Sequence, residues 1–194
     1  MADGEIREFL KQLRTAPRAV GAIAPSSSAL AEAMVAPIDF ALARAIVELG
    51  PGTGSITAAI AARLTPRTRY IGIEISPAFC AGLTRRFPGL DFVNGSAGDL
   101  QAILATAGIG AADAVICGLP WASLPVDFQE RTLAAVAASL SPGGLFVTFA
   151  YLQGLMLPAA HRLRRTLRRE FATVQRTRIV WRNLPPAFAY VCRR

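Results

Sequence analysis

The sequence predicts an α/β protein with a doubly wound, mostly parallel seven-stranded sheet. Short apolar segments alternate along the chain with segments whose apolar residues recur at helical spacing. A glycine-rich turn over residues 50–54 follows the first apolar run and opens into a helix. The next apolar run ends in an acid, Glu74, twenty residues beyond Gly54. Strand, tight turn, helix and second strand together make one βαβ unit.

The other elements repeat this alternation. We expect helices over residues 5–14, 29–35, 55–64, 77–87, 100–107, 129–140 and 161–171. We expect strands over residues 45–47, 69–74, 90–94, 114–117, 145–151, 173–181 and 187–192, with the last two forming a hairpin. Because no repeat or linker interrupts the pattern, we expect one domain over residues 1–194.

The first segment, residues 1–16, is expected to form an amphipathic helix that Pro17 ends. A narrow apolar stripe lies beside basic residues, and the set is Ile6, Arg7, Phe9, Leu10, Lys11, Leu13 and Arg14. A basic amphipathic helix can lie in a membrane interface. It can equally cap the core with its stripe, and the sequence leaves both alternatives open.

Composition favours a partner that carries phosphate. The chain of 194 residues has a formal net charge of +8, and Lys11 is its only lysine, so arginine supplies almost all of the positive charge. Such a balance suits nucleic acid, an anionic membrane surface or a phosphorylated substrate. A solvated basic surface without a partner is the alternative.

No metal site is expected. Cys80, Cys117 and Cys192 lack the spacing of metal ligands and lie in apolar surroundings, and His161 is the single histidine. The interval 132–160 carries no charge, but a Ser-Pro-Gly-Gly segment at 141–144 divides it, so we expect no transmembrane helix there.

In a doubly wound sheet the ligand lies at the carboxyl ends of the strands. That edge is expected to gather the glycine turn, Glu74, residues 96–97, residues 118–121 and Tyr151. The Glu74 carboxylate can accept two hydrogen bonds from ribose hydroxyls there. Ser26 and Ser27 precede a helix, so they are expected to cap it, or to bind a carboxylate or phosphate of a substrate.

Glu48, the turn with Gly50, Gly52 and Gly54, and Glu74 resemble the cofactor motifs of class I methyltransferases that use S-adenosylmethionine. A dinucleotide-binding loop is the alternative, but its pattern needs the third glycine or an alanine one residue after Gly54. The resemblance implies a Rossmann-like domain with S-adenosylmethionine as its cofactor. It implies cofactor contacts from the three glycines and Glu74, from Glu48 near the methionine end, and from Ile75, Ser96 and Ala97.

Three segments look more narrowly like bacterial phospholipid N-methyltransferases: Gly21-Ala22-Ile23-Ala24-Pro25-Ser26-Ser27, Gly118-Leu119-Pro120 and Asn183-Leu184-Pro185-Pro186-Ala187-Phe188. That family converts phosphatidylethanolamine stepwise to phosphatidylcholine at the membrane surface. The resemblance implies this reaction, an anionic membrane surface as partner, and a cytoplasmic enzyme peripherally associated with the inner face of the cell membrane. We expect a monomer and no nucleic-acid partner.

The lipid amine must be neutral when it attacks the methyl group. The backbone carbonyls of Gly118 and Leu119 are candidate acceptors for its hydrogens, and Tyr151 is a candidate substrate contact. Trp121 is expected either to border the ammonium group or to pack in the core.

Two other functions remain open. An rRNA adenine dimethyltransferase would carry Asn or Asp at the position of Gly118 to hold the adenine amino group, so Gly118 favours a lipid amine. A non-catalytic module that binds RNA or lipid would need neither the glycine turn nor Glu74.

Deleting residues 1–14 should abolish sedimentation of the protein with anionic liposomes and leave S-adenosylmethionine binding measurable. Each basic residue near such a surface contributes about 1 kcal/mol of binding, so rising salt should also release the intact protein. If the shortened protein still sediments at the same salt, the helix caps the core instead.

Overall fold

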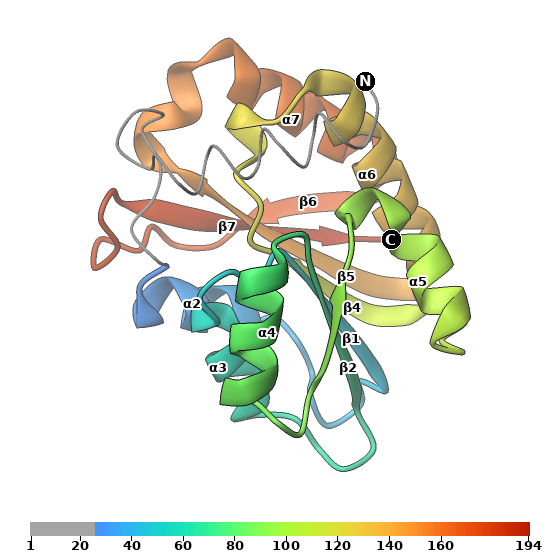
Figure 1. The fold of residues 1–194 in the computed structure, drawn as a ribbon. Helices are drawn as coiled ribbons and strands as arrows, with labels where there is room; N and C mark the ends of the chain where they lie inside the picture. Colours follow the sequence, from blue (N-terminus) through green and yellow to red (C-terminus); the bar gives the residue numbers. More distant parts are fainter. Residues whose placement is uncertain (1–25) are drawn as a thin grey trace.

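The computed structural model describes residues 26–194, whose strands form a single sheet in the order β3-β2-β1-β4-β5-β7-β6 (Figure 1). The strands are β1 (Ala45–Leu49), β2 (Arg69–Glu74), β3 (Asp91–Asn94), β4 (Ala112–Cys117), β5 (Leu140–Tyr151), β6 (Thr173–Arg176) and β7 (Ala187–Arg193). The first five run parallel, and β7 lies antiparallel between β5 and β6. The predicted doubly wound, mostly parallel seven-stranded sheet is confirmed.

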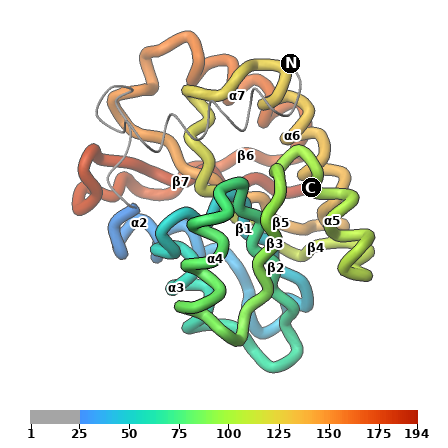
Figure 2. Tube along the Cα trace, in the orientation of Figure 1, coloured from blue at the N-terminus to red at the C-terminus, as the bar shows by residue number. Residues whose placement is uncertain are grey.

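Helices cover both faces of the sheet, and each face has its own apolar core. The α-helices are α2 (Ser28–Val35), α3 (Ser55–Ala61), α4 (Pro77–Arg86), α5 (Leu100–Thr106), α6 (Val126–Ser139) and α7 (Pro158–Glu170). Leucines and isoleucines of α2 and α3 join the core of one face, and those of α5, α6 and α7 join the core of the other. Figure 2 shows the two helical layers along the Cα trace. The predicted helix over residues 5–14 lies outside the described residues.

Strand order reverses between β1 and β4, because β2 and β3 continue to one side of β1 while β4 and β5 lie on the other. The chain therefore leaves the sheet in opposite directions after β1 and β4, and the connections cannot fill the space between these two strand ends. This switch point lies at the carboxyl edge of the sheet. The ligand position that the sequence predicts is this carboxyl edge.

Predicted boundaries of α6 and β5 were wrong. Helix α6 begins at Val126 rather than Gln129 and ends at Ser139 rather than Leu140. Strand β5 starts at Leu140 rather than Leu145, and its register against β4 shifts between the pairs Ala112↔Leu140 and Ala114↔Leu145. The segment thus forms an irregularity within the strand and does not precede it.

The predicted strand over residues 173–181 was too long. β6 ends at Arg176, after which the Thr177 hydroxyl accepts a hydrogen bond from the Ala189 N–H at 2.9 Å. Beyond β6 the Thr177 N–H donates to the Ala189 carbonyl at 2.9 Å, and an isolated bridge pairs Val180 with Ala187. The Thr177 hydroxyl replaces a backbone acceptor in the hydrogen-bond ladder between β6 and β7. The regular strand therefore ends early, and residues 177–186 form a loop.

The three cysteines are buried and unpaired with one another, as their apolar surroundings predicted. Burial raises the pKa of the Cys117 and Cys192 thiols to about 12. Within residues 26–194 no three His, Cys, Asp or Glu side chains gather as a metal site would require. No helix in this part of the chain has the length and apolar character needed to cross a membrane.

Candidate active site

The glycine turn connects β1 to α3 at the centre of the sheet. Gly50, Gly52 and Gly54 have φ angles of 68°, 59° and 83°, a left-handed region that side chains with a Cβ rarely adopt. Gly54 is also the N-cap of α3, so the helix begins directly from the turn. The N–H groups of Gly50 and Gly54 donate to the Ile73 and Pro51 carbonyls at 2.9 and 3.0 Å, so these bonds fix the turn directly before the helix.

The loops after β1 and β4 touch through their backbones. The Gly118 N–H donates to the Leu49 carbonyl at 2.8 Å. A Cβ on Gly118 would lie 2.9 Å from the Gly50 carbonyl oxygen, and a Cβ on Gly50 would lie 2.7 Å from the Leu119 side chain. Packing therefore explains the glycine at position 118. Its missing side chain no longer distinguishes a lipid amine from a nucleobase as the substrate.

Glu74 ties the turn to the end of β2. Its carboxylate is buried, with one oxygen accepting from the Gly52 N–H at 3.0 Å and the other from the Ser76 N–H at 2.8 Å. The carboxylate therefore lies directly beside the glycine turn at the carboxyl edge of the sheet. Ile75, the next residue, is half-buried and packs against the core of the α5–α7 face.

Glu48 lies on the other face of β1, against α3. One carboxylate oxygen accepts from the Tyr70 hydroxyl at 2.6 Å and from the Thr57 hydroxyl at 2.8 Å, and the other has no hydrogen-bond partner. Burial raises the pKa of Glu48 to about 7, although both hydrogen bonds lower it. Gly72 makes room for this contact, because a Cβ there would lie 2.8 Å from the Tyr70 oxygen.

The sequence pointed to Glu48 but not to its partners. Thr57 and Tyr70 lie nine and twenty-two residues away, on α3 and β2. Their only sequence signal is that both carry a hydroxyl within otherwise apolar segments.

The loop after β3 carries the residues predicted to lie near adenine. Ser96 is buried and caps the 3₁₀ helix η1 (Ala97–Asp99), since its hydroxyl accepts from the Gly98 N–H at 3.2 Å. Ala97 is buried beside it. Asp99, which the sequence reasoning passed over, is an exposed carboxylate in the same short helix.

The predicted residues at the ends of β4 and β5 are either half-buried or buried. Gly118 and Tyr151 are half-buried, whereas Leu119 is buried and its carbonyl already accepts from the Trp121 N–H at 3.0 Å. The Trp121 indole lies in the core, where it donates to the Thr148 hydroxyl at 2.7 Å and meets Phe146 edge-on. Of the two alternatives for Trp121, the structure therefore shows packing in the core. Burial raises the pKa of the Tyr151 hydroxyl, whose ring lies against Phe149.

Ser27 caps α2, because its hydroxyl accepts from the Leu30 N–H at 3.2 Å. Its own N–H donates to the Asn183 side chain at 3.0 Å, which brings the start of α2 to the β6–β7 loop. Ser26 is half-buried beside it. The residues predicted to bind a membrane all lie outside the described residues: Ile6, Arg7, Phe9, Leu10, Lys11, Leu13 and Arg14.

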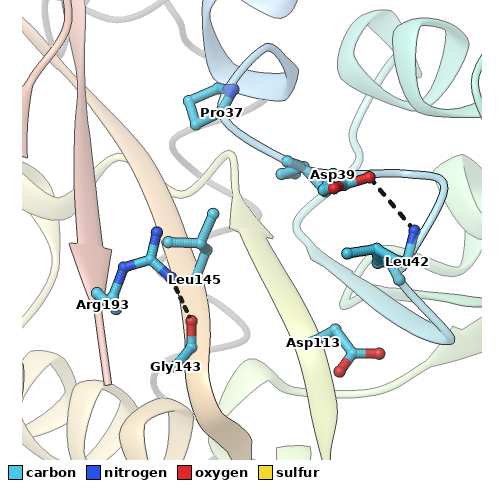
Figure 3. A pocket seen from close by; sticks show the side chains of 9 residues that line it. Pro37, Asp39, Leu42, Asp113, Gly143, Leu145 and Arg193 are labelled. Carbon is cyan, nitrogen blue, oxygen red and sulfur yellow. Dashed lines mark hydrogen bonds between the residues drawn. The ribbon is translucent and has the colours of Figure 1, made fainter.

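A shallow pocket of about 190 Å³ lies at the opposite edge of the sheet, between Pro37, Leu42 and Arg193 (Figure 3). Two of its charged side chains already form hydrogen bonds with the backbone of neighbouring elements. Asp113 accepts from the Arg44 and Ala45 N–H groups at 2.7 and 3.0 Å, and Arg193 donates to the Gly143 carbonyl at 2.8 Å. We therefore place the site at the carboxyl edge and not in this pocket.

The sheet order, the glycine turn at the switch point and the acid after β2 define a class I methyltransferase domain. The sequence matches the Methyltransferase domain family over residues 47–146, and the chain belongs to this family. Its cofactor is S-adenosylmethionine.

A curated relative covers nearly the whole chain. It is an ornithine lipid N-methyltransferase from Singulisphaera acidiphila, 39% identical over 180 residues, which span 90% of this chain and 88% of the relative.

Solved structures share the fold at low sequence identity. A TehB-like S-adenosylmethionine-dependent methyltransferase from Corynebacterium glutamicum is 14% identical with a TM-score of 0.59, covering 99% of this chain and 100% of that one. A putative rRNA methylase from Clostridium thermocellum is 17% identical with a TM-score of 0.60, covering 77% and 86%. Identities this low support the fold and nothing finer.

Glu48→Gln should change how stability depends on pH. Below pH 4.5 Glu48 is protonated in the folded and the unfolded chain; between pH 4.5 and about 7 only the unfolded chain ionises, so stability falls as the pH rises. Glutamine keeps the shape and removes this loss. From below pH 4.5 to above pH 7, the free energy of unfolding of the variant should rise relative to the wild type by about 2–4 kcal/mol. Denaturant titrations of both proteins measure it, and a constant difference would contradict the raised pKa.

Proposed function

We propose that the protein transfers a methyl group from S-adenosylmethionine to the primary amine of a membrane lipid. The observation that carries this proposal is the 39% identity to an ornithine lipid N-methyltransferase over 90% of the chain. Ornithine lipid is therefore the first candidate substrate. Phosphatidylethanolamine is the second, because three segments of the sequence resemble phospholipid N-methyltransferases. Both headgroups present an amine and one anionic group at the surface of a bilayer.

The carboxyl edge has the features that the cofactor needs. In our proposal the ribose hydroxyls meet the Glu74 carboxylate beside the glycine turn, where the glycines let a ligand approach the main chain without side chains in the way. In our proposal Ile75, Ser96 and Ala97 line the adenine side. In our proposal Glu48 lies on the methionine side, where its buried carboxylate accepts from the Thr57 and Tyr70 hydroxyls.

S-adenosylmethionine supplies a methyl group that its sulfonium already activates, so the protein mainly has to align the amine behind it. Removing water from the amine favours its neutral, nucleophilic form. The half-buried Gly118 carbonyl is the better of the two predicted acceptors for an amine hydrogen, because the Leu119 carbonyl already accepts from Trp121. Tyr151, at the end of β5, is proposed to contact the headgroup.

The proposal places the enzyme in the cytoplasm, peripherally associated with the inner face of the cell membrane. Its basic charge suits an anionic bilayer, and the amphipathic segment over residues 1–16 provides a candidate anchor. An rRNA substrate would use the same charge. The relationship to an RNA methylase rests on fold alone, whereas the relationship to a lipid methyltransferase rests on sequence.

Glu74→Ala should weaken S-adenosylmethionine binding by about 1.5–3 kcal/mol, because a charge-assisted acceptor is lost. Calorimetric titration measures the affinity, and circular dichroism checks that the variant is folded. Glu130→Ala is the control, since Glu130 is an exposed acid on α6 that pairs with Arg169. Equal affinities in the folded Glu74 variant and the wild type would remove Glu74 from the cofactor site.

The methyl acceptor can be identified with labelled S-adenosylmethionine and three separate substrates. These are vesicles containing ornithine lipid, vesicles containing phosphatidylethanolamine, and unmethylated small-subunit rRNA. We expect label in methylated headgroups of the lipid fraction. Gly118→Ala should abolish transfer by displacing Gly50, whereas Gly110→Ala, where a Cβ meets nothing within 4 Å, should not. Label in adenine alone would refute the lipid proposal and leave the cofactor site intact.

A further inference from the structure

Large apolar side chains are exposed mainly in two segments of the described chain. Seven such side chains are exposed between residues 26 and 194, and five of them belong to these segments. Met156 and Leu157 lie where the 3₁₀ helix η3 (Leu152–Met156) meets α7 and are 88% and 53% exposed. Trp181 and Leu184 lie in the β6–β7 loop and are 69% and 83% exposed, and Ile179 of this loop is 38% exposed.

Both segments leave the sheet at the edge that carries the active site. Tyr151, at the carboxyl end of β5, pairs with Ala187, where β7 begins. The Leu152 N–H donates to the Pro186 carbonyl at 2.8 Å, so the start of η3 is bonded to the end of the β6–β7 loop. Since β5 is parallel to β1 and β4, the two segments lie on the side of the sheet where the glycine turn lies (Figure 1).

Hydrogen bonds hold the loop so that its polar residue faces inward. Asn183 is buried, its N–H donates to the Val180 carbonyl at 3.3 Å and its side-chain amide donates to the Pro185 carbonyl at 2.7 Å. Its side-chain oxygen accepts from Ser27 at 3.0 Å. Arg182 and Leu184 on either side of Asn183, and Trp181 before them, are exposed.

Basic residues flank the apolar ones. Arg178 and Arg182 are exposed, and no acid of residues 26–194 forms an ion pair with either. Trp and Arg are side chains of the membrane–water interface, where an amphipathic ring and a long stem cross from apolar to polar surroundings. An RNA partner would stack on Trp181 and pair with the arginines, but it offers nothing to Leu184 and Met156. An anionic lipid bilayer suits all of these groups.

We propose that Met156, Leu157, Trp181 and Leu184, with Arg178 and Arg182, form a membrane-docking surface that inserts into the interface of an anionic bilayer. This inference rests on the proposed lipid methylation. The purpose of the surface is to hold the carboxyl edge of the sheet against the lipid layer that contains the headgroups. None of these residues belongs to the segment over residues 1–16.

The test compares vesicle binding by full-length variants. Trp181→Ser/Leu184→Ser should lower the partition coefficient on phosphatidylcholine–phosphatidylglycerol vesicles by roughly ten- to a hundredfold. Arg178→Gln/Arg182→Gln should lower it by about 25-fold, and only when phosphatidylglycerol is present. Leu42→Ser is the matched control, because Leu42 is 77% exposed at the opposite edge of the sheet, and it should bind as the wild type does.

Tryptophan fluorescence gives a second measurement on the unaltered protein. Lipids with brominated acyl chains should quench Trp181, while Trp121, which is 2% exposed in the core, keeps its emission. Wild-type binding without quenching, variants that bind as tightly as the wild type, or a wild type that does not bind vesicles would each overturn the docking surface. Loss of RNA binding by the loop variants, with vesicle binding unchanged, would overturn it as well.

Methyl transfer separates this inference from the proposed function. If the enzyme methylates lipid, the loop variants should still methylate lipid dispersed in detergent micelles at the wild-type rate and should lose transfer only on vesicles. Loop-dependent vesicle binding without any lipid methylation would refute the proposed function and leave the docking surface standing.

Discussion

The contact between the backbones of Gly50 and Gly118 determines the shape of the site. It brings together the two loops that diverge at the switch point, because a Cβ on Gly118 would lie 2.9 Å from the Gly50 carbonyl oxygen and the φ of 68° at Gly50 favours glycine. The turn must then pass above β2, where Glu74 accepts from the Gly52 N–H. Backbone groups of the two loops therefore form most of the site, and the Glu74 carboxylate is hydrogen-bonded to one of them. Since the atoms of the site are mostly main chain, its chemistry depends on conformation more than on side-chain identity.

Local patterns predicted the sheet because each strand of a doubly wound fold is a short apolar run next to a turn or helix signal. The boundaries failed where a long-range contact decided them. Thr177 replaces a ladder bond to Ala189, twelve residues away, and β5 extends through Pro142 because β4 pairs with Leu140 beyond a register shift. Neither effect is visible in the residues that the strand itself contains.

For the site, the sequence predicted the glycine turn after β1, because a glycine pattern reports a backbone requirement directly, and the roles of Glu74 and Ser96 toward a cofactor stay predictions. It could not assign Trp121, since an indole at a strand end can face a ligand or the core, and the Thr148 hydroxyl that settles its place lies 27 residues further along the chain. It also missed the outward face of the β6–β7 loop. The inward turn of Asn183 decides that face through bonds to Pro185 and Ser27.

The antiparallel position of β7 has a consequence for how such enzymes diverge. β7 pairs along its whole length with β5, while β6 is a four-residue strand at the margin of the sheet. The connection between them is bonded to Ser27 and Leu152, but its side chains Trp181 and Leu184 are exposed. It emerges at the same edge of the sheet as the glycine turn, so substitutions at these exposed positions can change what that edge binds while the buried strands stay the same.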